Sequence, residues 1–278
     1  MKHRMVETSH SDVAIAESVG DGPPVLFIHG NSSCKEVFRN QLQGDIGQTW
    51  CCIAMDLPGH GRSADAADPE TTYNMPGYAD TALEMMSALG HDTFALFGWS
   101  LGGHIGIEML HRSDRLTALM ISGSPPIGKE PDALSVGFKP SEHMHLAGQS
   151  EFTDEEVDAY ARATCGINAP FEDFLRDAVA RTDGRARELM LSKFIAGVGC
   201  NQKHTVMNSD IPFSIVNGAE EPFVNNDFVA SIGLQNLWDD KLHLLEDVGH
   251  APFWEAPELF DPLLMRFLKE HVGHGSSV

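Results

Sequence analysis

Short apolar runs alternate with stretches of helical periodicity along most of this chain. Seven runs have the length and composition of strands, and several are apolar at every position: 13–17, 25–28, 51–55, 94–97, 119–122, 214–216 and 243–245. Continuous apolar runs are typical of strands that are buried on both faces of a parallel sheet. Helical periodicity occurs at 78–89, 101–111 and 257–271. This alternation predicts an α/β fold with a mostly parallel, doubly wound sheet.

Residues around 127–209 interrupt this rhythm, because helix-like stretches follow one another there without a strand signal. A capping box, Thr153-Asp154-Glu155-Glu156, opens one helix that Gly166 can end, and others are expected near 171–181 and 185–194. A helical block between two strands is expected to cover the carboxyl ends of the strands, where open α/β sheets bind ligands. We therefore predict a core of residues 1–126 and 210–278 and a helical cap of residues 127–209, called the cap segment below. The alternative is a set of surface helices with no role in binding.

The charge balance restricts the possible partners. Asp and Glu number 40 against 19 Lys and Arg, which gives a formal net charge of -21 and argues against nucleic acid or an anionic membrane as partner. No apolar run approaches the ~18 residues that span a bilayer, and polar residues follow Met1-Lys2-His3-Arg4 where a secretory signal would be apolar. The five cysteines are odd in number and lack CxxC spacing, so a reduced, cytoplasmic protein is the simplest expectation. Nothing in the sequence implies a protein partner.

The strongest chemical signal is the segment Gly98-Trp99-Ser100-Leu101-Gly102, which lies between a buried apolar run and a predicted helix. A GxSxG segment in this context is typical of a nucleophile elbow, in which a sharp turn exposes the serine hydroxyl. The turn needs small flanking residues because the serine backbone is strained. Ser100 is therefore the predicted nucleophile.

Acyl transfer also needs two donors for the developing oxyanion. The backbone N–H of Leu101, directly after the nucleophile, is expected to supply one. The turn His29-Gly30-Asn31-Ser32 is expected to supply the other through Asn31, since Gly30 allows a close approach of the backbone.

The general base is expected near the C-terminus, on a loop after the last strand. His250 fits this position in Asp247-Val248-Gly249-His250-Ala251-Pro252-Phe253. The competing histidines lie in a strand, in the C-terminal tail or one turn after the nucleophile: His243, His271, His274 and His104. His104 is interpreted as a packed or capped helix residue.

The acid that orients His250 should follow the run at 214–216. The loop Asn217-Gly218-Ala219-Glu220-Glu221 offers two carboxylates, and Asp227 is a weaker third candidate. We favour Glu221, because an acid three residues beyond the glycine recurs in this loop.

Two further motifs could be interpreted as catalytic. The segment from Asp56 to Ser63 is rich in Pro and Gly, and a structural role as a turn is favoured for it. His143 and His145 hint at a metal site, but no further ligands complete a set, so a zinc-dependent hydrolase is disfavoured. We predict neither a metal nor a cofactor.

Taken together, these motifs resemble the α/β-hydrolase superfamily over essentially the whole chain. Residues flanking the motifs are similar to the AidH-type N-acyl-homoserine lactonases: His29-Gly30-Asn31-Ser32-Ser33, Gly98 through Met109, Val216-Asn217-Gly218, Glu221-Pro222-Phe223-Val224, Gly249-His250-Ala251-Pro252-Phe253, and the cap stretches 160–166 and 181–187. Scattered differences occur in the cap, for instance around 141–145.

The resemblance implies an α/β-hydrolase fold and a metal-independent serine enzyme that opens N-acyl-homoserine lactones, which would quench quorum signals. In that group the triad acid is a glutamate in the Glu-Pro-Phe-Val context, which corresponds to Glu221, and a cap tyrosine that contacts the substrate corresponds to Tyr160. Further substrate contacts are expected from His29, Gly30, Trp99, Met144 and Phe223, and the apolar cap residues Leu146, Phe171 and Phe194 are candidates for enclosing an acyl chain. The alternatives are a general carboxylesterase of the same fold and, less favoured, a small-molecule receptor.

Overall fold

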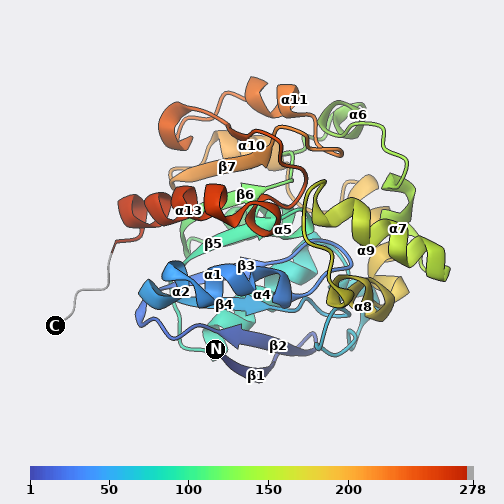
Figure 1. Cartoon of the computed structure of the whole chain (residues 1–278), viewed down its shortest axis with the longest axis horizontal. Helices are drawn as coiled ribbons and strands as arrows, with labels where there is room; N and C mark the ends of the chain where they lie inside the picture. The colour runs from blue at the N-terminus through green and yellow to red at the C-terminus, as the bar shows by residue number, and fades with distance from the viewer. Residues whose placement is uncertain (274–278) are drawn as a thin grey trace.

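The strands of the chain assemble into a single sheet in the computed structural model, which describes residues 1–273 (Figure 1). Within these residues the sheet has eight strands in the order β1-β2-β4-β3-β5-β6-β7-β8. Pairing from β4 to β8 is parallel, whereas β1 and β2 run antiparallel to their neighbours. The strands are β1 (Lys2–Glu7), β2 (Asp12–Glu17), β3 (Gly22–Ile28), β4 (Trp50–Met55), β5 (Phe94–Trp99), β6 (Leu116–Ser122), β7 (Phe213–Gly218) and β8 (His243–Leu245). The predicted α/β class and all seven predicted strands are confirmed.

The edge strand β1 was not predicted, and its surroundings explain why. Only Val6 of this strand is buried, and the other side chains face solvent. An edge strand with one partner therefore carries Lys2, His3 and Arg4 at little cost, and its sequence lacks the apolar pattern of the inner strands.

Helices cover both faces of the sheet. On one face α4 (Met75–Ala88) packs against α5 (Leu101–Arg112), and on the other α13 (Pro257–His271) packs with shorter helices. The alternation of side chains along β3 separates the two cores, because Leu26 and Ile28 join the first and Val25 and Phe27 join the second. The shorter helices of the core are η1 (Lys35–Phe38), α1 (Arg39–Gln43), α2 (Asp45–Thr49), α3 (Pro69–Thr72), α11 (Asn226–Ser231), η3 (Trp238–Asp240) and α12 (Pro252–Glu255).

The cap segment lies between β6 and β7 and is helical, as its sequence predicts. The predicted capping box at Thr153 is formed at the start of α7, and Gly166 ends this helix with a φ of 112°. Helices α7, α8 and α9 gather at one side of the sheet (Figure 1), whereas α10 packs against α5 of the core. The helices are α6 (Ala133–Gly137), η2 (Met144–Gly148), α7 (Asp154–Cys165), α8 (Asp173–Arg181), α9 (Gly184–Ile195) and α10 (Gln202–Met207).

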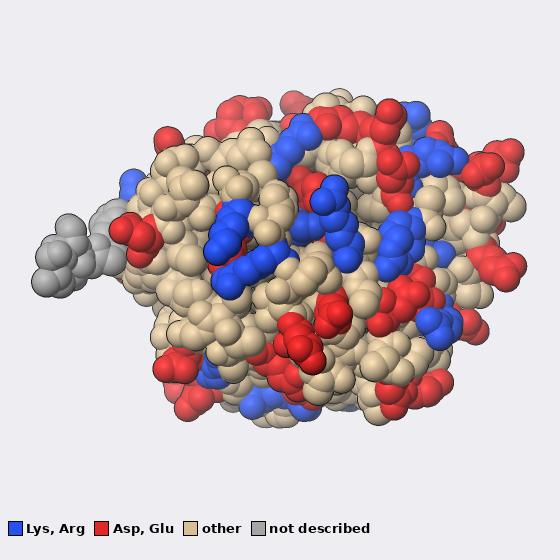
Figure 2. Space-filling view, turned by 90° about the horizontal axis from the view of Figure 1, so that it is seen from below, with Lys and Arg blue, Asp and Glu red and all other residues tan. Residues whose placement is uncertain are grey.

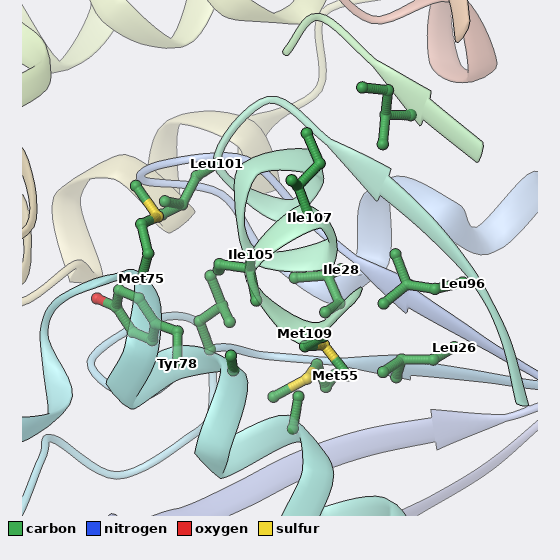
Figure 3. Close-up of a cluster of buried hydrophobic side chains, with 14 of the residues drawn as sticks. Leu26, Ile28, Met55, Met75, Tyr78, Leu96, Leu101, Ile105, Ile107 and Met109 are labelled. Atoms are coloured by element: carbon green, nitrogen blue, oxygen red, sulfur yellow. The ribbon is translucent and has the colours of Figure 1, made fainter. Parts of the chain in front are cut away.

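The first core continues up to the carboxyl end of the sheet. Figure 3 shows its side chains converging from β3, β4, β5, α4 and α5. Leu101 and Met75 close this cluster at the end where α5 begins, and both also line a cavity described below. The elements that carry the candidate site are therefore packed into the hydrophobic core.

The surface charges are mixed despite the acidic total. On the face shown in Figure 2, basic side chains lie among acidic ones rather than forming an uninterrupted basic surface. Several arginines are ion-paired, including Arg39 with Glu172 and Arg181 with Asp65. Among residues 1–273, no helix has the length and apolar character needed to cross a membrane. All five cysteines are free.

A buried ion pair explains the motif around Asp56. Its carboxylate, fully buried after β4, accepts hydrogen bonds from Nζ of Lys35 at 2.7 Å and from the backbone N–H of Lys35 at 2.7 Å and of Arg62 at 2.8 Å. Burial alone would lower the pKa of Lys35, but the charge and hydrogen bond of Asp56 outweigh it and raise that pKa. Asp56 therefore joins two loops at the carboxyl end of the sheet, which supports the structural role predicted for the motif.

Replacing Asp56 by Asn should destabilise the protein strongly, because it removes the buried counter-charge of the Lys35 ammonium and leaves only the less buried carboxylate of Glu36, 3.0 Å away. We expect the free energy of unfolding to fall by about 3–5 kcal/mol in urea denaturation. The matched control is Asp80→Asn, which breaks the exposed pair with Arg112 and should cost less than about 1 kcal/mol. Equal losses in the two variants would contradict the assignment.

Candidate active site

Ser100 adopts a strained backbone conformation between β5 and α5, with φ 54° and ψ −117°. Neighbouring groups hold it there: its N–H donates to the carbonyl of Ser122 at 2.8 Å, and its own carbonyl accepts from Oγ of Ser124 at 2.7 Å. Strain of this kind persists only where surrounding bonds determine it, and it is typical of functional sites. Ser100 is thus fixed at the N-terminus of α5, as the elbow motif predicts.

Two glycines make close contacts with neighbouring segments around this turn. A Cβ on Gly102 would lie 2.0 Å from the carbonyl oxygen of Ile28, so α5 could not approach β3 with any other residue there. A Cβ on Gly30 would lie 3.1 Å from Cβ of Ser100. The loop after β3 therefore passes directly beside the nucleophile candidate.

Two backbone N–H groups are available beside Ser100. That of Leu101 is at the first position of α5, where a helix offers no acceptor of its own. That of Asn31 donates to no other group among residues 1–273. The side chain of Asn31 is held in turn, since its Nδ2 donates to the carbonyl of Ala147 at 2.8 Å and to Oη of Tyr160 at 3.3 Å.

His250 follows β8 and is fixed from three sides. Nε1 of Trp99 donates to its carbonyl at 2.8 Å, and the ring of Phe223 lies edge-on to the imidazole at 4.8 Å between centroids. Nδ1 of His250 lies 2.8 Å from Oε2 and 2.9 Å from Oε1 of Glu221. A carboxylate in this position orients an imidazole and leaves Nε2 to exchange a proton.

Of the three acids considered from sequence, the structure brings only Glu221 to His250. Its side chain is buried, and Oε1 also accepts from the backbone N–H of Phe223 at 2.9 Å. Glu220 and Asp227 are exposed. The loop therefore presents one carboxylate inward and leaves its neighbour in water.

A cavity brings most of the candidate residues together. The core contributes Gly30, Asn31, Met75, Trp99, Ser100, Leu101, His104, Gly123, Phe223 and His250. The cap segment contributes Phe138, His143, Met144, Ala147, Tyr160, Thr164, Met190, Leu191 and Phe194. The cavity thus combines a small polar end at Ser100 with a predominantly apolar wall, an arrangement suited to a ligand with a polar head and an apolar chain.

Some of the residues chosen from sequence lie elsewhere. His29 does not line the cavity: its ring is fully buried, its Nε2 accepts from the backbone N–H of Leu57 at 3.0 Å, and burial lowers its pKa. Leu146 packs inside the cap segment, and Phe171 packs both there and against the second core. His271 ends α13, and His274 lies outside the described residues.

Other lining residues were missed by the sequence reasoning. Thr164 is one helical turn after Tyr160, and Met190 is one turn before Phe194, so the i, i+4 spacing could have indicated them. Phe138 and Met75 come from segments with no such relation to a motif. His104 was interpreted as a packed residue, and it is both buried and cavity-lining.

Tyr160 carries a protonated hydroxyl at the cavity wall. Its side chain is buried, and burial raises the pKa of Tyr160 to about 12. Because Oη accepts from Asn31, its own proton is free to be donated to a ligand. Among residues 1–273, no group of three or more His, Cys, Asp or Glu side chains could hold a metal ion.

The chain is similar to several known proteins. The model of the alpha/beta hydrolase family matches residues 25–262. A crystal structure of a glutamate-to-glycine variant of the N-acyl homoserine lactonase AidH, complexed with N-hexanoyl homoserine, is 48% identical with a TM-score of 0.94, covering 100% of this chain and 98% of that chain. A serine-to-glycine variant of AidH complexed with N-hexanoyl homoserine lactone is 49% identical with a TM-score of 0.94, covering 97% and 98% of the two chains. A pimeloyl-[acyl-carrier protein] methyl ester esterase of Neisseria meningitidis is 23% identical, covering 88% of this chain and 76% of that protein.

The His250–Glu221 pair should control the reactivity of Ser100. We expect a fluorophosphonate probe to label the wild-type protein at Ser100 and to leave Ser100→Ala unlabelled. Glu221→Gln should slow labelling by about 10³–10⁴-fold, because an amide no longer holds the imidazole in the required tautomer. Rates are followed by intact-protein mass spectrometry.

The matched control is Glu220→Gln, which removes the neighbouring exposed carboxylate and should label at the wild-type rate. Slow labelling in Glu220→Gln with normal labelling in Glu221→Gln would reverse the assignment.

Proposed function

The chain belongs to the alpha/beta hydrolase family, and from this premise we propose that it is a metal-independent serine hydrolase that opens the lactone ring of N-acyl-homoserine lactones. Its biological effect would be to quench quorum signals. The observation that carries this proposal is the cavity in which Ser100, His250 and Tyr160 meet an apolar wall. The AidH structures, 48–49% identical to this chain, are complexed with N-hexanoyl homoserine and its lactone, which supports the same ligand class here.

Acylation uses the three residues of the proposed triad. Oγ of Ser100 bonds to the lactone carbonyl carbon while its proton passes to Nε2 of His250. Glu221 stabilises the resulting imidazolium through Nδ1. The backbone N–H groups of Asn31 and Leu101 hold the oxyanion, and such donors are typically worth about 2.7–4 kcal/mol each.

Ring opening leaves the departing alcohol attached to the acyl-enzyme. The single bond between the carbonyl carbon and the ring oxygen breaks. His250 gives its proton to the ring oxygen, which becomes the hydroxyl of homoserine. Water then attacks the acyl-enzyme with His250 as base, Ser100 recovers its proton, and N-acyl homoserine is released. Because the tethered hydroxyl competes with water, the cavity must position water well for hydrolysis to prevail.

The cap segment acts in this proposal as a lid over the core of residues 1–126 and 210–278. Tyr160 donates a hydrogen bond to the polar head of the substrate, and Met144, Phe194 and the other apolar lining residues enclose the acyl chain. Gly30, Trp99 and Phe223 shape the end of the cavity beside Ser100. The five free cysteines are consistent with a cytoplasmic location, which we also propose.

Lactone turnover should distinguish this function from that of a general carboxylesterase, the alternative suggested by the Neisseria relative. We expect hydrolysis of N-hexanoyl homoserine lactone that persists after exhaustive treatment with EDTA and disappears in Ser100→Ala. Product formation is measured by chromatography, with p-nitrophenyl butyrate as the comparison substrate. Turnover of the aryl ester without turnover of the lactone would exclude the lactonase.

Tyr160→Phe should raise KM for N-hexanoyl homoserine lactone about two- to tenfold, since one neutral hydrogen bond to the substrate is lost. The matched control is Tyr78→Phe: the Tyr78 hydroxyl is buried outside the cavity and has no hydrogen-bond partner within residues 1–273. Steady-state kinetics of both variants check this role. An unchanged KM in Tyr160→Phe would remove Tyr160 from substrate binding.

A further inference from the structure

His104 places a polar group in the apolar part of the cavity. It lies on α5 one turn after Ser100, is 6% exposed, and lines the cavity. Its ring lies between two aromatic side chains, with centroids 6.0 Å from Phe138 and 5.0 Å from Phe194. The proposed mechanism gives this imidazole no role.

The hydrogen bonds around His104 determine which of its nitrogens carries the proton. Nδ1 lies 2.8 Å from Oε1 of Gln202, and the same oxygen accepts from the backbone N–H of Ile127 at 3.3 Å. A backbone N–H can only donate, so the atom it meets must be the amide oxygen of Gln202 and not its nitrogen. Nδ1 of His104 is therefore the protonated nitrogen.

The other nitrogen is left as an open acceptor. Burial lowers the pKa of His104 to about 4, so the ring is neutral near neutral pH and Nε2 carries a lone pair. Nε2 makes no hydrogen bond to any of residues 1–273, nor is it among the buried polar atoms sealed from solvent. Its accessible surface therefore opens into the cavity that the ring lines.

We propose that Nε2 of His104 makes the site selective for acyl chains that carry a hydroxyl group at the third carbon. This inference rests on the proposed function and specifies the substrate within it. One helical turn, about 5.4 Å along the axis, separates His104 from Ser100. A few covalent bonds of the substrate span a similar distance between the ring carbonyl and the third carbon of the acyl chain.

The chemistry of the lone pair sets the order of preference. A hydroxyl can donate to Nε2, an unsubstituted chain leaves Nε2 without a partner, and a 3-oxo group brings a second acceptor against it. A buried acceptor that loses its partner carries a cost, so hydroxylated substrates are favoured over unsubstituted ones and 3-oxo substrates are the least favoured.

The test compares kcat/KM for 3-hydroxyhexanoyl, hexanoyl and 3-oxohexanoyl homoserine lactone. For the wild-type enzyme we expect the hydroxylated substrate to exceed the unsubstituted one by about two- to tenfold. The 3-oxo substrate should fall below both.

Two variants and one control separate selectivity from general damage. His104→Phe removes the acceptor and should bring the ratio of hydroxylated to unsubstituted substrate to about one. Gln202→Met removes the acceptor of Nδ1, so that the proton of His104 can move to Nε2. The ratio of kcat/KM for the 3-hydroxy substrate to that for the 3-oxo substrate should then fall. This variant also tests the proposal if His104→Phe fails to fold. His111→Phe makes the same substitution at an exposed position of α5 outside the cavity and should keep the wild-type ratios.

The outcomes distinguish a failure of this inference from a failure of the proposed lactonase function. A wild-type enzyme that opens hexanoyl homoserine lactone without preferring the 3-hydroxy form overturns the role of His104 and leaves the lactonase intact. An equal loss on all three substrates in His104→Phe would show that Nε2 meets a group common to them, such as the amide N–H, and also overturns it. A wild-type enzyme inert on all three overturns the function and the inference together.

Discussion

The positive φ of Ser100 is the constraint around which the site is arranged. A non-glycine residue in this conformation is held only by contacts on both sides, and here β6 binds its N–H while Ser124 binds its carbonyl. The same turn starts α5 beneath the hydroxyl and orients the N–H of Leu101. The close approach of Gly102 to β3 then brings the loop with Asn31 to the other side of the nucleophile. One local distortion, secured by the sheet, therefore brings together the proposed nucleophile and both proposed oxyanion donors.

Much of the fold could be predicted because burial imposes simple patterns. The strands β2 to β8 are apolar where helices cover both faces, and α13 was predicted with its observed limits because its apolar stripe has a clear period. The edge strand β1 and the short helices α1 and α2 escaped prediction. They bury little surface of their own and are stabilised by tertiary neighbours, which a local pattern does not record.

The same distinction applies to the candidate site. Ser100, His250 and Asn31 follow strands at fixed offsets, so sequence alone predicts them, and the structure brings them to one cavity. Sequence alone favours Glu221 over Glu220 as the acid, and the geometry adds that the loop turns Glu221 inward to His250 and leaves Glu220 exposed. His29 was expected to contact the substrate, yet its ring is buried and accepts a hydrogen bond from the backbone N–H of Leu57. His104 went unrecognised because a buried polar helix residue does not reveal its open lone pair.

The amide side chain of Asn31 has a consequence for catalytic timing. This residue supplies a backbone donor beside Ser100, and its Nδ2 is bound to Ala147 and Tyr160, both in the cap segment. A displacement of Ala147 and Tyr160 would break these two bonds and remove the restraint on the donor. The order of this N–H group therefore depends on two residues that line the same cavity. A ligand that kept Ala147 and Tyr160 away from Asn31 would therefore bind beside a less ordered donor, which ties the acceptance of a substrate to the position of these two residues.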